Sequence, residues 1–498
     1  MTSKRVLFVV LLALAITACS ANAKNYGDKC KVDSDCGTET MVCSLQNSKK
    51  ICKQKGLFPM LGREIGGMVL MVVLSMFAVI AGAGGGPLYV PVLQLIFGMS
   101  SKETVALSNG LTVFSSCSSL IGNLGRKDPD IPRRSLINFD ALLTINPTLL
   151  LGSAVGAILN SFMADVVRMI VFVFLIMYAI TQSIKKTRDL LQKERAQAFK
   201  EQEPAQKAIA DKPEPSERIR LESAPQEPEK AGLSLPPAEP AAGDSTARAV
   251  AATTEPAEDA ALREAIVSQE GRVITWPNML SIWGSFVIAG VIALLRGGSG
   301  FKGWANSSQC DSVDWVLFTI LAVAMFVFAF FGSRYVLRKQ QNKTKLKLHD
   351  KNEVEWTTQT IGKGWAFTVF MGACSTLSGL GGGSIMAPFF YSINLMPKTA
   401  SATSLLTIFF SKIVVTVMNY VAGVLPLYYL LFVGSFIFVG GVISNYMSGY
   451  ILTKFKRQSF ISGIFVFEIG VCLVLFCIAS GLSIANSSSG VLKFASYC

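Results

Sequence analysis

Two stretches of the sequence place three consecutive glycines inside apolar segments. They read AGAGGGPLYVP over 81–91 and SGLGGGSIMAPFFY over 378–391. Glycine adopts backbone angles that other residues avoid, so three in a row can end one half-helix and start another. The new half-helix, at Pro87 or Ser384, would present unpaired N–H groups and a partial positive charge. Two such ends converging would form a site for a small anion.

Setting Gly82 against Gly379 aligns both stretches on the pattern G-x-G-G-G-x4-P. For a single copy, close helix packing would be an equal alternative, because small residues commonly let membrane helices approach. Two copies with the same downstream proline favour a binding site. The predicted substrate-binding residues here are Gly82, Gly84, Gly85, Gly86, Pro91, Gly379, Gly381, Gly382, Gly383, Ser384 and Pro388.

The correspondence continues beyond the glycines. After a gap of one residue the aligned pairs are Lys102 with Lys398, Ala106 with Ala402, Ser108 with Ser404, and Asn123 with Asn419. Further on, GAILN ending at Asn160 resembles GVISN ending at Asn445. The chain is therefore predicted to contain two copies of one unit, roughly 63–184 and 362–482.

Ionisable residues inside membrane helices are candidates for function. Lys412 could attract an anion, with Glu468 as its counter-ion or as a protonatable coupling group; a purely structural Lys–Glu pair is the alternative. Lys102 and Lys398 lie near helix ends, where snorkelling to headgroups competes with a role in substrate binding. The polar residues that could donate to an oxyanion, or simply link helices, are Ser108, Ser404, Asn109 and Asn123.

These residues lie in a chain of 498 residues that is 51% hydrophobic and only 16% charged. Near-continuous apolar runs of about 20 residues indicate membrane-spanning helices. The runs are 65–83, 104–122, 139–160, 163–184, 276–295, 314–333, 400–422, 428–450 and 460–480. The sequence predicts an all-α polytopic membrane protein.

Basic loops predict the orientation, because cytoplasmic loops carry an excess of Lys and Arg. The loop after 104–122 contains Arg126, Lys127, Arg133 and Arg134, so it should be cytosolic. The preceding N-terminal segment should be outside, which requires 65–98 to enter and return as a hairpin. The second unit starts from a basic cytosolic loop, 334–361, and so runs the opposite way. We expect two inverted repeats, each a glycine-broken helical hairpin followed by about three spanning helices.

The N-terminal residues are typical of a secreted segment. Residues 1–23 have the layout of a cleavable signal peptide; an uncleaved anchor or lipidation at Cys19 are the alternatives. The next segment, 24–60, should be an extracellular cysteine-rich module that binds a ligand or only adds stability. Its four cysteines predict two disulfides with three possible connectivities: Cys30, Cys36, Cys43 and Cys52.

Between and after the two units the composition changes. Residues 185–275 are rich in Ala, Pro and Glu, which predicts a largely disordered cytosolic linker. Residues 276–333 should be a connecting helix pair, and 483–498 a lumenal tail. Glycosylation sequons at Asn306 and Asn486 agree with lumenal positions. The domain boundaries expected are thus 1–23, 24–60, 61–184, 185–275, 276–333, 334–361, 362–482 and 483–498.

Enzyme chemistry has little support in the sequence. The single histidine, His349, lies in a basic loop, and no HExxH or G-x4-G-K-[ST] pattern is present. We expect no metal and no cofactor. The net charge of +13 comes from basic residues beside membrane segments and does not indicate nucleic acid. The expected partners are a small anion, the lipid bilayer, a second copy in a homo-oligomer and a cytosolic protein that binds the linker.

The motifs GAGGGPLYVP and GLGGGSIMAP, the helices after each and the two-copy layout resemble the sulfite exporter TauE/SafE family. The resemblance covers about 60–185 and 275–482. It implies a transporter that exports sulfite or organosulfonates. The inverted repeats predict a secondary transporter working by alternating access, and the signal peptide predicts a membrane of the secretory route. The alternatives are a receptor-like or scaffolding protein whose cysteine-rich module binds a ligand, and an anion channel.

Overall fold

A computed structural model describes most of the membrane portion of the chain. The residues described are 30–32, 41–46, 49–128, 134–210, 263–264, 266, 268, 276–298, 303, 311–346, 354–455 and 459–486. The expected signal peptide, most of the linker, the sequon at Asn306 and residues 487–498 lie outside this set. The chain divides into one unit of residues 1–187 and 269–498 and a second of 188–268. The first unit contains the features described below.

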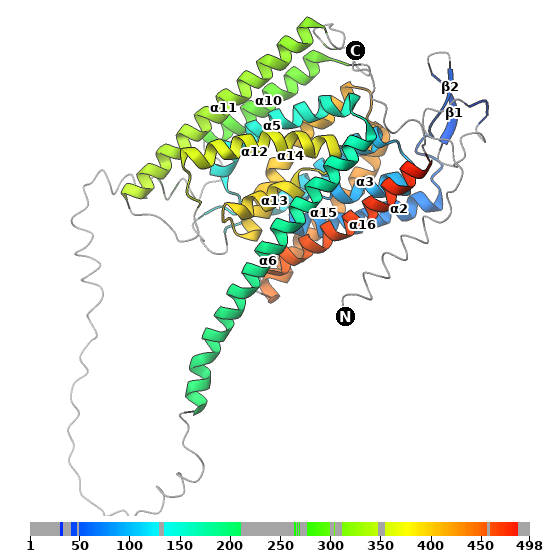
Figure 1. The fold of residues 1–498 in the computed structure, drawn as a ribbon. Coiled ribbons are helices and arrows are strands. Elements are labelled where there is room, and N and C mark those ends of the chain that lie inside the picture. The colour runs from blue at the N-terminus through cyan, green and yellow to red at the C-terminus, as the bar shows by residue number, and fades with distance from the viewer. Residues whose placement is uncertain are drawn as a thin grey trace, which may run out of the picture. The chain divides into compact units, whose positions relative to one another are not determined.

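The membrane unit is built from helices (Figure 1). They are α2 (Gly62–Ala81), α3 (Gly86–Leu95), α4 (Ser101–Asn123), α5 (Phe139–Phe162), α6 (Asp165–Ala210), α10 (Trp276–Arg296), α11 (Ser312–Lys345), α12 (Thr358–Ser378), α13 (Gly383–Ser392), α14 (Pro397–Val421), α15 (Leu427–Phe455) and α16 (Ser459–Asn486). Within the described ranges, eight helices are long and apolar enough to cross a membrane, and Leu280–Arg296 is a shorter apolar helix. The prediction of an all-α polytopic membrane protein is confirmed.

Each glycine stretch joins a long helix to a half-helix that turns back beside it. In the first copy, Gly67 near the start of α2 packs against Ile96 and Phe97, just after α3 ends. In the second copy, Phe367 of α12 stacks on Phe389 of α13 with ring centroids 4.7 Å apart. Both pairs therefore form the hairpins expected from the sequence, each with α3 or α13 as a ten-residue arm.

The helices that follow the two hairpins, α4 and α14, run antiparallel. The start of α14 meets the loop after α4, where Thr399 donates to Asp128 at 2.9 Å and the Asn138 N–H donates to Thr403 at 3.0 Å. Beyond the other end of α14, Leu425 shares a hydrophobic cluster with Met99, which precedes α4. The two helices therefore run in opposite directions through the membrane unit.

The first helix of each hairpin runs parallel to a helix of the other copy. The hydroxyls of Thr148 in α5 and Thr368 in α12 are 2.8 Å apart, and further along Gly156 packs against Ala373. On the other side, Ser444 of α15 donates to the carbonyl of Met76 in α2 at 2.6 Å. The contacts α5–α12 and α15–α2 correspond to each other when the two copies are exchanged.

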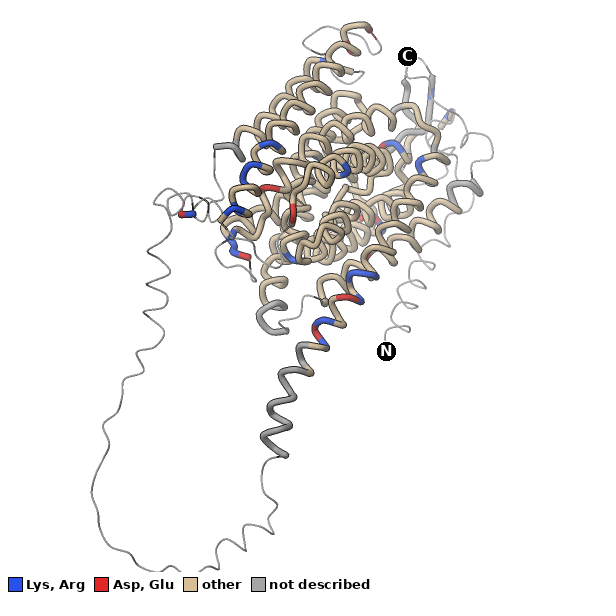
Figure 2. Tube along the Cα trace, turned by 60° about the vertical axis from the view of Figure 1, so that its left-hand side comes forward, with Lys and Arg blue, Asp and Glu red and all other residues tan. Residues whose placement is uncertain are grey.

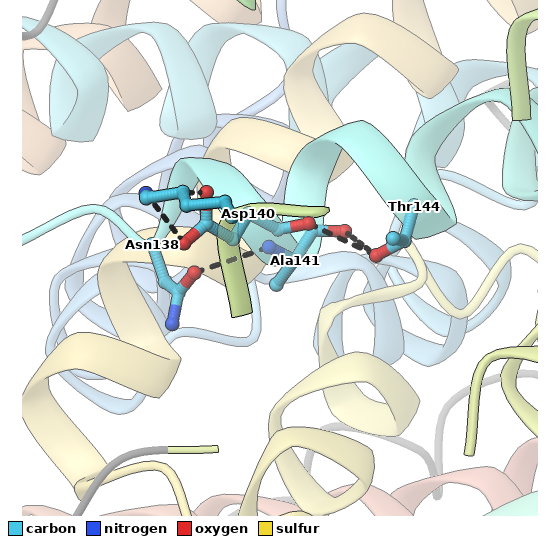
Figure 3. Close-up of polar contacts among 5 residues, drawn as sticks. Asn138, Asp140, Ala141 and Thr144 are labelled. Atoms are coloured by element: carbon cyan, nitrogen blue, oxygen red, sulfur yellow. Dashed lines mark hydrogen bonds and ion pairs between the residues drawn. The ribbon is translucent and has the colours of Figure 1, made fainter. Parts of the chain in front are cut away.

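The start of α5 is fixed by a cap and an ion pair (Figure 3). The side chain of Asn138 accepts the N–H of Ala141 at 3.1 Å, which satisfies one of the free donors of the first turn. Lys339 of α11 donates to both carboxylate oxygens of Asp140 at 2.9 Å. The basic end of α11 and the start of α5 thus lie at the same end of the membrane unit.

Charged residues are sparse along the spanning helices, and Lys412 and Glu468 are buried exceptions. Lys and Arg lie mainly toward helix ends, and long stretches of the tube between them carry neither sign (Figure 2). The helix α6 extends through Ala210, so the expectation that disorder begins at residue 185 is wrong for its first part. Residues 185–200 are mostly Lys, Arg, Leu, Gln, Glu and Ala, which are strong helix formers, so the helix continues beyond its apolar part.

The cysteine-rich module contains an antiparallel hairpin of β1 (Met41–Gln46) and β2 (Lys49–Gln54). Cys30 is bonded to Cys43. The second predicted pair lies outside the description, because Cys36 and the side chain of Cys52 are not covered. Beyond the hairpin, Phe58 packs edge-on against Phe432 of α15, so the module joins the end where α2 and α15 begin.

Candidate functional site

The two glycine stretches meet in the centre of the membrane unit, and residues 82–86 and 379–383 are called the glycine junction below. A Cβ atom at Gly86 would lie 2.6 Å from the Cα of Gly381. A Cβ atom at Gly383 would collide with the backbone of Ala83. Backbone therefore packs directly on backbone, which only glycine permits, and the N-terminal ends of α3 and α13 are brought together.

Two glycines at the junction also need their backbone freedom. Gly85 and Gly382 are the N-cap residues of α3 and α13, with φ angles of 80° and 83°. L-residues with side chains rarely adopt such angles. Because the first N–H groups of a helix have no intrahelical acceptor, each half-helix presents donors and a partial positive charge here.

Serines from each copy stabilise the glycine stretch of the other. The Ser108 hydroxyl of α4 is 2.9 Å from the carbonyl oxygen of Gly379 and 3.0 Å from that of Gly86. The Ser404 hydroxyl of α14 donates to the carbonyl of Gly82 at 3.2 Å. The predicted pair Ser108 and Ser404 thus lies at the junction, where both hydroxyls link helices, the second of the two roles expected for them.

Lys412 lies beside the second half-helix. It is buried on α14 and donates to the hydroxyl of Thr376 on α12 at 3.2 Å. Its Cε is 3.7 Å from the position that a Cβ of Gly382 would occupy. A buried ammonium therefore stands next to the N-cap of α13, where the helix end is also positive.

Glu468 lies on the side of the first half-helix. It is buried on α16, and neither carboxylate oxygen has a hydrogen-bond partner among the described residues. One turn further along α16, the thiol of Cys472 donates to the carbonyl of Pro87 in α3 at 3.0 Å. The direct Lys412–Glu468 pair expected as one alternative does not form, because Lys412 on α14 lies beside α13 whereas Glu468 on α16 lies on the side of α3.

Several polar groups at the junction were not among the predicted residues. The hydroxyl of Tyr89 reaches back over Gly85 and has no hydrogen-bond partner within the described structure. Thr376, which holds Lys412, also accepts a bond from the Asn109 amide through its carbonyl at 3.4 Å. A signal for the polar face existed in the spacing of four between Thr104, Ser108, Thr112 and Ser116, all of them buried on α4.

Other predicted residues lie near the junction or away from it. Ser384 is in the first turn of α13, and its buried hydroxyl has no partner in the part of the chain described. Pro91 and Pro388 are buried inside the short helices. Lys102 and Lys398 are in the first turns of α4 and α14, at helix ends away from the junction. Asn123 donates to Ser119 at the end of α4 at 3.0 Å.

The junction combines two half-helix ends, one buried cation and several hydroxyl groups. Such a set of donors can replace the hydration of a small anion. Across the described ranges, no cluster of His, Cys, Asp or Glu could hold a metal ion. Fold and junction together define the class: a helical membrane protein with broken helices meeting at its centre.

Comparison with known proteins identifies the family within this class. The sulfite exporter TauE/SafE family model matches residues 2–182 and 280–471, and the chain belongs to this family of membrane transporters, which are not enzymes. The match begins at residue 2, further towards the N-terminus than the span expected from the glycine motifs.

Two relatives from Arabidopsis thaliana show how far the similarity extends. Sulfite exporter TauE/SafE family protein 3 is 22% identical over 417 residues, which cover 83% of this chain and 75% of the relative. Sulfite exporter TauE/SafE family protein 5 is 23% identical over 359 residues, covering 71% of this chain and 69% of the relative. No solved structure matches the chain at a significant level.

Proposed function

We propose that the protein is a secondary transporter that exports a small sulfur oxyanion, sulfite or an organosulfonate, through an anion site at the glycine junction. The observation that carries this proposal is the position of Lys412 beside Gly382, at the N-terminal end of α13. A buried cation and a helix N-terminus both attract an anion. Burying an ammonium without a counter-charge is unfavourable, so a bound anion would balance the charge of Lys412 in this low-dielectric site.

Alternating access is the second part of the proposal. The contacts of Ser108 with Gly379 and of Ser404 with Gly82 are equivalent when the copies are exchanged. So are the close approaches of Gly379 to Val105 and of Gly82 to Ser401. Together with the antiparallel course of α4 and α14, these exchanged contacts support inverted repeats. Such repeats let one half rock against the other around a fixed site.

Glu468 is proposed to couple transport to a second ion. Its carboxylate is buried beside α3 while Lys412 is beside α13, so the two groups can respond to different ligands. A carboxyl group in this position can take up a proton or a small cation when the anion leaves. Glu468→Gln should therefore keep anion binding but lose the response of flux to an imposed ion gradient.

The remaining expectations belong to this proposal as well. With the basic loops cytosolic, the cysteine module, the 297–311 loop with Asn306 and the tail after Asn486 would lie outside. The tail sequon begins at the last residue of α16. A signal peptide, a second disulfide and glycosylation would follow from passage through the secretory route.

Flux into proteoliposomes tests the function directly. Purified protein should carry sulfite with saturable kinetics, and an organosulfonate should compete, whereas a neutral sulfone of similar size should not. The matched variant is Lys412→Met, which keeps the length of the side chain and removes its charge. No saturable flux of any anion in a panel of sulfite, sulfate, thiosulfate and sulfoacetate would overturn the proposal.

A further inference from the structure

A small, partly open cavity lies away from the glycine junction. It measures about 50 Å³ and is lined by residues from the end of α5, the ends of α10 and α14 and the start of α11. Its polar side chains are Arg296, Asp314 and Asn419. The hairpin of α10 and α11 belongs to neither repeat, so this cavity has walls that the repeated core alone does not provide.

One wall is a buried ion pair. Arg296 donates from Nε and Nη2 to the two carboxylate oxygens of Asp314, at 2.6 and 3.0 Å. The guanidinium also lies 5.5 Å from the ring centroid of Phe318. This two-pronged geometry fixes the guanidinium and neutralises the carboxylate, so the wall is polar and rigid.

The opposite wall carries a donor without an acceptor. Asn419 is 5% exposed, and its Nδ2 has no hydrogen-bond partner among the residues that the structure describes. A buried donor left in this way is unfavourable unless a ligand or water satisfies it. Its counterpart in the first repeat, Asn123, is satisfied by Ser119. The orphaned donor therefore occurs on the side with the cavity and not at the corresponding position of the other repeat.

The cavity is aligned with the central site along one helix. Asn419 follows Lys412 by seven residues on α14, which places it two turns further on, roughly 10 Å along the same helix face. This end of α14 leads to Leu425, which clusters with residues beside the cysteine-rich module. The cavity is thus on the side of the membrane unit opposite the basic end of α11.

We propose that this cavity is an outer anion subsite, in which Asn419 and Arg296 hold the exported oxyanion after it leaves Lys412. The proposal rests on the transport function proposed above. An oxyanion presents several acceptor oxygens, so one oxygen can accept from the Asn419 amide while another faces the guanidinium. The Asp314 carboxylate, held by Arg296 on both oxygens, does not enter the binding contacts.

The subsite makes the transporter asymmetric. The inward-facing end has Asn123 in the corresponding place, with its amide already bonded to Ser119. An anion leaving the junction would therefore find a second set of donors only on the outer side. An intermediate binding site there divides the path of the anion from the junction to the outer water into two shorter steps.

Calorimetric titration of sulfite into the purified full-length protein tests this inference. The wild type should show two binding steps. Asn419→Leu should remove the step that belongs to the outer cavity and leave the step at the glycine junction. Lys412→Met should remove the step at the junction and leave the other. The matched control is Asn123→Leu, which changes the counterpart residue and should leave both steps unchanged. Asn419→Asp keeps the shape of the side chain and repels an anion, so it should also remove one binding step. It replaces Asn419→Leu as the test if the leucine variant folds poorly.

Exchange of sulfite across oriented vesicles gives a second measure. Asn419→Leu should raise the half-saturating sulfite concentration at the outer face at least tenfold and change the inner value less than twofold. Two unchanged binding steps in both Asn419 variants would overturn the outer subsite and leave the transport function standing. Absence of sulfite binding and flux in the wild type would overturn both proposals.

Discussion

The side chain of Lys412 shows how one residue can be costly to the fold and necessary to the function. Its ammonium is buried and donates to a neutral hydroxyl, Thr376, at 3.2 Å. In the first repeat the corresponding position is Ser116, which donates to the carbonyl of Thr112 at 2.7 Å. The charge is therefore an addition made in one copy only, at the place where the N-cap of α13 would meet an anion.

Lys412→Met should separate these two effects. Because the substitution removes an uncompensated buried charge and keeps the volume, the unfolding temperature should stay the same or rise. Sulfite flux should fall at least tenfold. Fluorescence-detected thermal unfolding and proteoliposome uptake measure the two quantities, with Lys102→Met as the control at a helix end. A large fall in stability with retained flux would contradict the assigned role.

The distance between Lys412 and Glu468 can be tested by a double-mutant cycle. The structure places them on different helices, α14 beside α13 and α16 beside α3, without a direct contact. The effects of Lys412→Met and Glu468→Gln on the free energy of unfolding should therefore add to within about 0.5 kcal/mol. A coupling energy well above that value would mean that the two side chains form an ion pair in the membrane.

At the scale of elements, the two hairpins depend on glycine for different reasons. Gly86 has the backbone of Gly381 where its own Cβ would be, so nothing flexible can move aside. Gly382 has room for a Cβ, because the nearest atoms would be 3.7 Å away in ordinary van der Waals contact, but its φ is 83°. Backbone contact between the copies excludes a side chain at Gly86, and the left-handed backbone conformation disfavours one at Gly382.

This difference predicts unequal effects of alanine. Gly382→Ala should fold and lose roughly 1–2 kcal/mol of stability from the left-handed backbone angle. Gly86→Ala should prevent the two halves from closing, so little monodisperse protein should be recovered by size-exclusion chromatography. Equal recovery of both variants would show that the junction can spread, contrary to the backbone contact described here.

The sequence was sufficient to predict the hairpins and the equivalence of Ser108 and Ser404 in the two copies, because both follow from repeated spacing. It did not predict α12 as a separate apolar run, since Gly, Thr and Ser dilute the helix. The structure has no direct Lys412–Glu468 contact, which was one of the alternatives left open, because distance along the chain does not say which half-helix a side chain lies beside. The cavity at Asn419 needed the position of α10 and α11, which spacing in the repeats cannot supply.

At the scale of the whole molecule, the course of the helices gives a topology that labelling can check. The loop after α4 meets the start of α14, and the start of α15 meets the cysteine-rich module. Lys127 and Tyr428 are both exposed and lie at these opposite ends. Inverted repeats remain a prediction that these contacts favour.

Single cysteines at the two positions should therefore differ in accessibility. In a background without the free cysteines, Tyr428→Cys should react with a membrane-impermeant maleimide in intact cells. Lys127→Cys should react only after the membrane is permeabilised. Labelling of both positions from outside would contradict the antiparallel course proposed for the two repeats.

The exchanged serine contacts impose an order on biosynthesis. The carbonyl of Gly82 accepts its hydrogen bond from Ser404, which is 322 residues later in the chain. At a synthesis rate of 5–20 residues per second, the first hairpin therefore waits roughly 15 to 65 s for this donor. During that interval the Gly82 carbonyl lacks this donor, and an unsatisfied carbonyl cannot face lipid. The insertion machinery, or water at the membrane surface, has to keep the first hairpin out of contact with lipid until the second copy is made.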